Sequence, residues 1–309
     1  MSYNITLLAN MERFTTEGEA RILVKVVGST ETVAFHVYPG FLKVDHRKAR
    51  VHRVNSSAVG EEVKIEGCKK NIETQMYWLT LEQKVDSGSM LELMLPFTGR
   101  LIGLCYVSNC TYEQKKEAGN DIKQSGFYLS DDGMGGLMGV TQFQPMFARQ
   151  AFPCFDEPHL KAKFTLRLGR PKEFKTRSNT RAVKVGEDVE GRPGYVWDSY
   201  ATTPVMSTYL LAWVIFKMES SKSESGRGVA VEAFHYDVAS SQNAADSAAD
   251  LLDIFEEIFG INYALDKMDM VAVPFFKWGG MENWGMTTYA EEYMRSTNFV
   301  IAHEMVKTI

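Results

Sequence analysis

The sequence predicts a mainly β protein in which an antiparallel β-sandwich is followed by the start of an α+β region, a sheet with one helix. Two observations support this prediction. Short segments rich in β-branched and aromatic residues, bounded by turn residues, recur through the first two-thirds of the chain. A single long segment near the end has apolar residues at helical spacing. Strands of this length at this spacing favour a sandwich over a parallel α/β sheet.

The sandwich strands are predicted from composition and from the turns between them. Clear examples of short apolar runs between turn residues are 21–27, 32–38, 76–81 and 90–95. The glycine-rich segment 131–139 lacks the Lys-Ser/Thr pair of a phosphate-binding loop, so we interpret it as a hairpin connection.

The boundary between the two regions is predicted from a change in pattern. Residues 206–216 are expected to form a buried strand, and the Ser- and Gly-rich residues 219–228 a polar turn after it. We therefore expect a sandwich domain over residues 1–217 and a second domain over residues 218–309.

Within the second domain, residues 241–259 are predicted to form an amphipathic helix, with Gly260 at the position of a left-handed C-cap. Residues 268–274 are predicted to form a strand that leads to a pair of glycines.

Composition narrows the classes of function. A net charge of −5 over 309 residues argues against a nucleic-acid partner, which selects for strongly basic faces. The sequence has no apolar run near the roughly 20 residues that span a bilayer, and its first residues lack the basic and apolar regions of a signal peptide, so we expect neither feature. Cytoplasmic localisation is therefore the default expectation.

The most informative segment is Gly279-Gly280-Met281-Glu282-Asn283-Trp284-Gly285, which is followed by His303 and Glu304. A helical His-Glu-x-x-His motif places two imidazoles on one face with a general base between them. Here Lys307 stands at the second histidine position. A catalytic zinc site needs three protein ligands and an open position for water. The segment thus begins a zinc motif without completing it.

Several motifs occur in an order that resembles the aminopeptidase N-like zinc aminopeptidases, a gluzincin family. They are Gly-Phe-Tyr at 126–128, Thr-Gln-Phe-Gln-Pro at 141–145, Phe-Pro-Cys-Phe-Asp-Glu-Pro at 152–158, Met-Ser-Thr-Tyr-Leu at 206–210, and the Gly-Gly-Met-Glu-Asn segment. The resemblance covers most of the chain. It implies an N-terminal β-sandwich and the start of a thermolysin-like catalytic domain, and its parent activity is removal of N-terminal residues from peptides.

The resemblance also implies roles for individual residues. Glu282 matches the glutamate that binds the substrate's α-ammonium, and Gln144 matches a second contact from the sandwich. Glycines 279 and 280 would lie beside the substrate as an edge strand, so the expected substrate-binding set is Gln144, Gly279, Gly280, Met281, Glu282 and Asn283. Taken alone, the Gly-Gly-Met-Glu-Asn segment could instead be a β-bulge with an exposed glutamate. The Phe-Pro-Cys-Phe-Asp-Glu-Pro segment is interpreted as structural.

By the same resemblance, His303 matches the first zinc ligand and Glu304 the general base. Lys307 replaces the second ligand, and an ammonium there would repel the metal. The family's third ligand, a glutamate on the next helix, has no counterpart, and the connection from Met294 to His303 is short. A solvent-facing histidine without metal is therefore the expectation for His303, and no zinc is expected to bind stably.

We therefore expect a truncated or degenerate zinc aminopeptidase homologue that is inactive alone and binds peptides with a free N-terminus weakly. The alternatives are a non-catalytic peptide- or protein-binding module, and an incomplete gene model or splice form of an active enzyme. Family members are often membrane-anchored or extracellular. An incomplete second domain is also expected to favour self-association.

Overall fold

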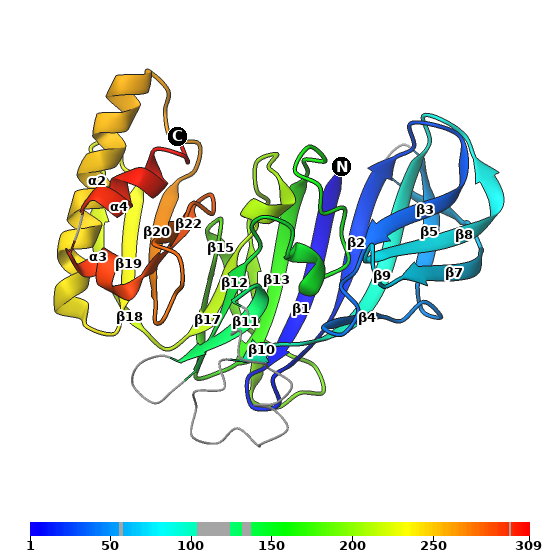
Figure 1. The fold of residues 1–309 in the computed structure, drawn as a ribbon, viewed down its shortest axis with the longest axis horizontal. Helices are drawn as coiled ribbons and strands as arrows, with labels where there is room; N and C mark the ends of the chain where they lie inside the picture. The colour runs from blue at the N-terminus through cyan, green and yellow to red at the C-terminus, as the bar shows by residue number, and fades with distance from the viewer. Residues whose placement is uncertain (56–57, 104–123, 132–136, 297) are drawn as a thin grey trace.

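The predicted strands form the sheets of a sandwich in the computed structural model, which describes residues 1–55, 58–103, 124–131, 137–296 and 298–309 (Figure 1). In this part of the chain the largest sheet, here the large sheet, has the order β15-β16-β13-β1-β2-β9-β5-β6, with β4 also beside β9. Its strands are β1 (Ser2–Asn10), β2 (Thr15–Lys25), β4 (Leu42–Val44), β5 (Arg50–Asn55), β6 (Ala58–Glu62), β9 (Met90–Arg100), β13 (Lys163–Pro171), β15 (Ala182–Asp188) and β16 (Tyr195–Tyr200).

Two smaller sheets pack with the large sheet. The middle sheet has the order β10-β11-β12-β17-β14, and a three-stranded sheet has the order β3-β8-β7. Their strands are β3 (Thr30–His36), β7 (Ile65–Asn71), β8 (Met76–Val85), β10 (Ile102–Gly103), β11 (Gly126–Asp131), β12 (Leu137–Gln142), β14 (Lys175–Ser178) and β17 (Trp213–Phe216). A short 3-10 helix, η1 (Ala148–Gln150), precedes the Phe-Pro-Cys-Phe-Asp-Glu-Pro segment.

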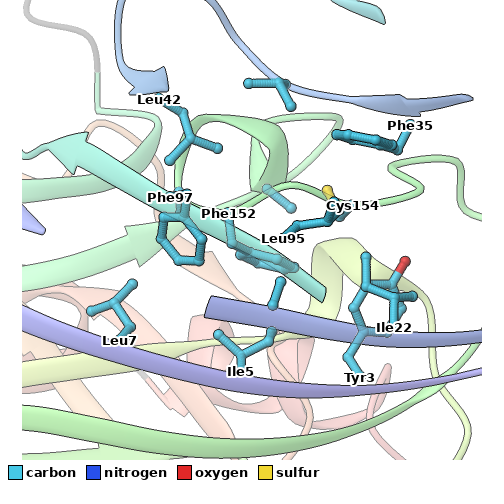
Figure 2. Packing of buried hydrophobic residues seen from close by; sticks show 14 of the residues in the cluster. Tyr3, Ile5, Leu7, Ile22, Phe35, Leu42, Leu95, Phe97, Phe152 and Cys154 are labelled. Carbon is cyan, nitrogen blue, oxygen red and sulfur yellow. The ribbon is translucent and has the colours of Figure 1, made fainter. Parts of the chain in front are cut away.

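The sandwich core lies between these sheets. Alternate residues of β9 are buried, as a strand with one face on a core requires. Figure 2 shows Tyr3, Ile5 and Leu7 of β1 near Phe152 and Cys154 of the structural segment. The Tyr3 and Phe164 rings stack with centroids 4.8 Å apart. The structural segment is thus packed inside the core, which accounts for its apolar composition.

The sandwich is antiparallel in most of its pairs, with two exceptions. β1 pairs in parallel with β13, and β10 pairs in parallel with β11. The predicted hairpin of the glycine-rich segment is flanked by an antiparallel pair, in which Asp131 lies opposite Leu137. Residues 132–136 of that connection lie outside the described residues.

The prediction of one strand over residues 206–216 was wrong in its first half. A 3-10 helix, η2 (Thr208–Leu210), occupies that part, and only Trp213–Phe216 forms strand β17. The hydroxyl of Ser207 donates to the carbonyl of Pro158 at 2.7 Å, and the hydroxyl of Thr208 donates to that of Phe155 at 3.2 Å. These contacts anchor the backbone to the structural segment rather than to a neighbouring strand.

The second half of the chain forms a mixed sheet, here the C-terminal sheet, in the order β18-β19-β20-β22-β21. Its strands are β18 (Glu219–Glu224), β19 (Ala230–His235), β20 (Lys267–Val273), β21 (Gly280–Met281) and β22 (Met286–Ala290). The segment predicted as a polar turn is therefore largely strand β18, because it pairs along its length with β19.

Both faces of the C-terminal sheet are covered. Met268, Met270 and Ala272 of β20 pack toward the helices, whereas Val271 and Val273 pack among middle-sheet residues such as Val214. This alternation has the period of two expected of a strand. The C-terminal sheet and the middle sheet therefore share one hydrophobic cluster, so the sheet does not expose the apolar strand surface on which the expected self-association rests.

The predicted helix is confirmed as α2 (Val238–Phe259), and Gly260 follows it with φ 63°. Two further helices, α3 (Glu291–Ser296) and α4 (Asn298–Met305), were not predicted as separate elements. The three helices lie on the same side of the C-terminal sheet (Figure 1). In the described part of the chain, no helix is both long enough and apolar enough to span a membrane.

Candidate amine-binding site

The glycine pair of the sequence motif lies at the edge of the C-terminal sheet. Gly280 and Met281 form β21, the outer strand, which pairs antiparallel with β22 so that Gly280 lies opposite Tyr289. The other side of β21 has no strand partner in the described structure. An edge strand can accept an extended peptide as an additional strand.

Glycine is required at position 280 because the side chain of Glu304 lies against its backbone. A Cβ added at Gly280 would lie 2.5 Å from Cγ of Glu304, which is closer than real Cβ contacts occur. The absent side chain thus lets α4 approach the edge strand and bring Glu304 beside the motif.

Two carboxylates and one ammonium meet at this position. Nζ of Lys307 lies 2.9 Å from a carboxylate oxygen of Glu304 and 3.5 Å from one of Glu282. The side chains of Glu304 and Glu282 are 6% and 14% exposed, while that of Lys307 is 36% exposed. The site therefore holds an ammonium between two mostly buried carboxylates, and Lys307 reaches it from the solvent side.

The electrostatics agree with this arrangement. Burial raises the pKa of Glu304, against the lowering effect of its hydrogen bond from Lys307. Burial lowers the pKa of Lys307, but the hydrogen bond to Glu304 and the charges of both glutamates outweigh it, so its pKa is raised. Lys307 is consequently an ammonium at neutral pH.

Tyr209 is the contribution of the sandwich side to this cluster. Burial and, second, the charge of Glu282 raise the pKa of its phenol, while Lys307 lowers it. Tyr209 belongs to η2, the element that the sequence analysis mistook for strand. The cluster therefore joins the two halves of the chain.

The other predicted site residues lie in different surroundings. The side chain of Gln144 is exposed, and no hydrogen bond joins it to Glu282 in the described structure. Gly279 lies near Tyr293 and Val300, which leaves its backbone beside the helices.

Met281 and Asn283 differ from the expectation of substrate contact. Their side chains are each 1% exposed, and Met281 belongs to the hydrophobic cluster shared with the middle sheet. The Nδ2 atom of Asn283 is buried and has no hydrogen-bond partner in the described structure. Because Gly280 has no side chain and that of Met281 is buried, only the backbone of β21 is available to a ligand at the edge.

His303 does not point into the cluster. Its side chain is exposed, and its ring stacks on that of Phe299 with centroids 6.3 Å apart. The helix α4 ends at Met305, so position 307 lies beyond the last helical turn. The imidazole and the side chain at position 307 therefore do not share one helical face.

These residues do not fit a catalytic zinc ion. Such a site needs three ligands with lone pairs, and the Lys307 ammonium has none to offer. The described residues contain no group of three or more His, Cys, Asp and Glu side chains arranged to hold a metal. The geometry instead fits a bound ammonium.

Two residues that hold the motif were missed by sequence reasoning. Nδ2 of Asn179 donates to the carbonyls of Leu210 (2.7 Å) and Trp284 (2.8 Å). Nζ of Lys267 donates to a carboxylate oxygen of Asp269 (2.6 Å) and to the carbonyl of Gly285 (2.8 Å). It also donates to the carbonyl of Ser178, the last residue of β14. They fasten the end of the motif to the sandwich.

The backbone of Gly285, at the end of the motif, lies very close to the backbone of Asn179 in the sandwich. Its φ is +78°, and an added Cβ would lie 2.0 Å from the backbone oxygen of Asn179. The presence of glycine at position 285 is consistent with close backbone packing. Nothing in the sequence, however, identified Asn179 or Lys267 as the residues that contact it.

The chain joins a β-sandwich to a mixed sheet and places a Gly-Gly-Met-Glu-Asn edge strand beside the helix that carries His303 and Glu304, the motifs on which the resemblance to the zinc aminopeptidases rests. Family comparison agrees with this class. Residues 1–210 match the peptidase M1 N-terminal domain, and residues 243–308 match the peptidase family M1 domain. The chain belongs to the peptidase M1 family, which is zinc-dependent in general, and the resemblance seen in the sequence is confirmed.

Relatives share sequence along nearly the whole chain. Endoplasmic reticulum aminopeptidase 1 of Rattus norvegicus is 32% identical over 94% of this chain and 29% of its own length. Alanine/arginine aminopeptidase of Saccharomyces cerevisiae is 33% identical over 94% of this chain and 31% of its own length. Thyrotropin-releasing hormone-degrading ectoenzyme of Rattus norvegicus is 29% identical over 99% of this chain and 28% of its own length. The chain thus spans about three-tenths of the length of these relatives.

Proposed function

We propose that this chain recognises the N-terminal ammonium of peptides at the Glu282–Glu304 pair, and that in the form described it binds peptides rather than hydrolysing them. The observation that carries the proposal is the position of the Lys307 ammonium between the two carboxylates. The names of the relatives, which are aminopeptidases, supply the ligand class.

The chemistry of the pair matches that ligand. A peptide α-ammonium and a lysine ammonium present the same three donors and the same charge. A peptide entering along β21 would place its first residue beside Glu282, with the backbone of Gly280 available for pairing. Gln144, on the sandwich, would supply a neutral acceptor to the same end of the peptide.

Lys307 is then an internal competitor for the same carboxylates. Its side chain is 36% exposed, so we expect its ion pairs to be worth only about 1 kcal/mol after screening by solvent. Removing it should therefore strengthen peptide binding by about fivefold. Affinity in the unmodified chain should be weak, on the order of millimolar.

Binding without hydrolysis follows from the donor set. Lys307 stands where the family motif has its second histidine, and the exposed His303 stacks on Phe299 instead of facing Glu282. Hydrolysis of aminoacyl anilides should accordingly remain at background, with or without added zinc.

The test is an NMR titration with a short peptide and with its N-acetylated twin. The free peptide should shift resonances around Glu282, and the acetylated one should not. Lys307→Met should tighten binding and Glu282→Gln should weaken it. Lys277→Met removes an exposed lysine near the motif and serves as the matched control. Equal responses to both peptides, or no effect of Glu282→Gln, would refute amine recognition.

A further inference from the structure

A second candidate site lies in the sandwich. A cavity of about 740 Å³ opens among β1, β2, β4, β7, β8 and β9, and none of its lining residues comes from the C-terminal sheet. Its volume falls within the range of about 300–1,000 Å³ typical of small-molecule sites. In Figure 1, β4 and β7 lie toward the end of the molecule away from the helices. We call this cavity the basic groove.

The charges of the basic groove are strongly unbalanced. Arg13, Lys43, Lys70 and Arg100 line it, and none of these four has a carboxylate partner in the described structure. A fifth cation, Arg192, is paired with Glu17, the one carboxylate among the lining residues.

This concentration of positive charge occurs in a chain whose net charge is −5. The four cations come from separate elements: a turn after β1, strand β4, strand β7 and the end of β9. Like charges brought together by folding repel one another, and a multivalent anion in the groove would relieve that repulsion.

The walls of the groove add a second kind of contact. Leu42 and Tyr77 are among the lining residues and are 3% and 7% exposed, and Phe41 lies beside them. Thr15 and Thr98, which carry hydroxyl groups, are also lining residues. The groove thus combines an apolar wall with hydroxyl donors and free cations.

We propose that the basic groove binds an organic polyphosphate, a molecule with two or more phosphate groups on an organic body. Arginine guanidinium groups match the geometry of phosphate oxygens, and lysine adds point charges. The volume exceeds that of one phosphate, and the wall at Leu42 and Tyr77 accommodates the organic part. The ligand is either a soluble polyphosphate or the phosphorylated headgroup of a lipid.

Strand β7 provides a matched control. Lys70 lies opposite Tyr77 in the β7–β8 pair, and both line the groove. The adjacent Lys69 lies opposite Trp78, so it faces the other side of the sheet. Lys70→Gln and Lys69→Gln therefore remove the same charge from neighbouring positions, and only the first removes it from the groove.

The experiment is calorimetric titration of the full chain with ATP and with inorganic triphosphate in magnesium-free buffer. A parallel arm measures sedimentation with phosphatidylcholine vesicles, with and without phosphatidylinositol bisphosphate. We expect Lys70→Gln and Arg100→Gln each to weaken binding about three- to tenfold and Lys69→Gln less than about twofold. Added salt should also weaken binding.

Each outcome decides the proposal. Binding of ATP that depends on Lys70 and Arg100 supports it with a soluble ligand, and binding only to the phosphoinositide vesicles supports it with a lipid headgroup. Absence of binding in both arms would overturn it. Equal losses in Lys69→Gln and Lys70→Gln would also overturn it, because the attraction would then be a general property of the surface.

Discussion

The replacement Lys267→Met tests whether the buried ammonium of Lys267 holds the motif to the sandwich. The side chains of Lys267 and Asp269 are 11% and 3% exposed, with Nζ 2.6 Å from the carboxylate. Removing one partner of a buried ion pair typically costs about 3–5 kcal/mol, because the other charge stays buried. Here Nε of Arg177, 3.9 Å from Asp269, remains as a partial partner.

We therefore expect a loss of about 3 kcal/mol in the free energy of unfolding, the lower end of that range. The double variant Lys267→Met/Asp269→Leu should recover most of it, leaving a deficit of about 1 kcal/mol. That remainder reflects the donor lost by the carbonyls of β14 and of Gly285, although Gly285 still accepts from the backbone amide of Asp269 at 3.0 Å.

The assay is urea unfolding at pH 7 followed by circular dichroism, with Lys277→Met as a surface control. If the free energy of unfolding of Lys267→Met lies within about 1 kcal/mol of that of the unmodified chain, then the ion pair does not stabilise the fold as argued. A double variant less stable than the single one would likewise contradict the idea that the uncompensated carboxylate causes the loss.

Three further predictions concern the site and the core. Elemental analysis after dialysis should find far less than one zinc per chain, and a stoichiometric zinc lost in His303→Ala would contradict our interpretation of the donor set. Gly285→Ala should destabilise the fold by more than about 2 kcal/mol, whereas Gly228→Ala, with φ +87° but no atom closer than 3.8 Å, should cost only about 1 kcal/mol in thermal or urea unfolding; equal costs would refute the close approach to Asn179. Burial and the charge of Arg149 lower the pKa of His36 to about 4. The neutral imidazole therefore contributes stability to the folded chain that is complete above pH 6.5 and is lost as the pH falls toward 4. Relative to His36→Asn, the unmodified chain should therefore lose about 1–2 kcal/mol between pH 7 and pH 4.5, an estimate reduced for partial exposure; a constant difference across that range would refute the shift.

The sequence was sufficient where the information is local. The spacing of apolar residues and Gly260 identified α2, and alternation identified strands such as β9. The sequence was misleading over residues 206–216, because side-chain hydroxyls of Ser207 and Thr208 bind a segment about fifty residues earlier.

For the candidate amine-binding site, too, the sequence was sufficient only where the information is local. Glu282 and Glu304 come from recognisable motifs, and the structure brings them to one ammonium. That this ammonium belongs to Lys307 follows only from how the chain continues beyond α4. The partners that fasten the motif, Asn179 and Lys267, depend on contacts between distant segments, which no local pattern records.

The hydrophobic cluster shared by the middle and C-terminal sheets has a kinetic consequence. Val214 of the middle sheet and Val271 of the C-terminal sheet belong to this cluster, and both are fully buried. The two sheets therefore cannot separate without exposing apolar surface to water. The proposed amine site lies beside this cluster, with Glu282 next to β21 and Tyr209 in η2 next to β17, so we expect no hinge between them. We expect a ligand to enter a rigid opening, with an association rate that is independent of any domain closure, and the two halves of the chain to melt in a single cooperative transition.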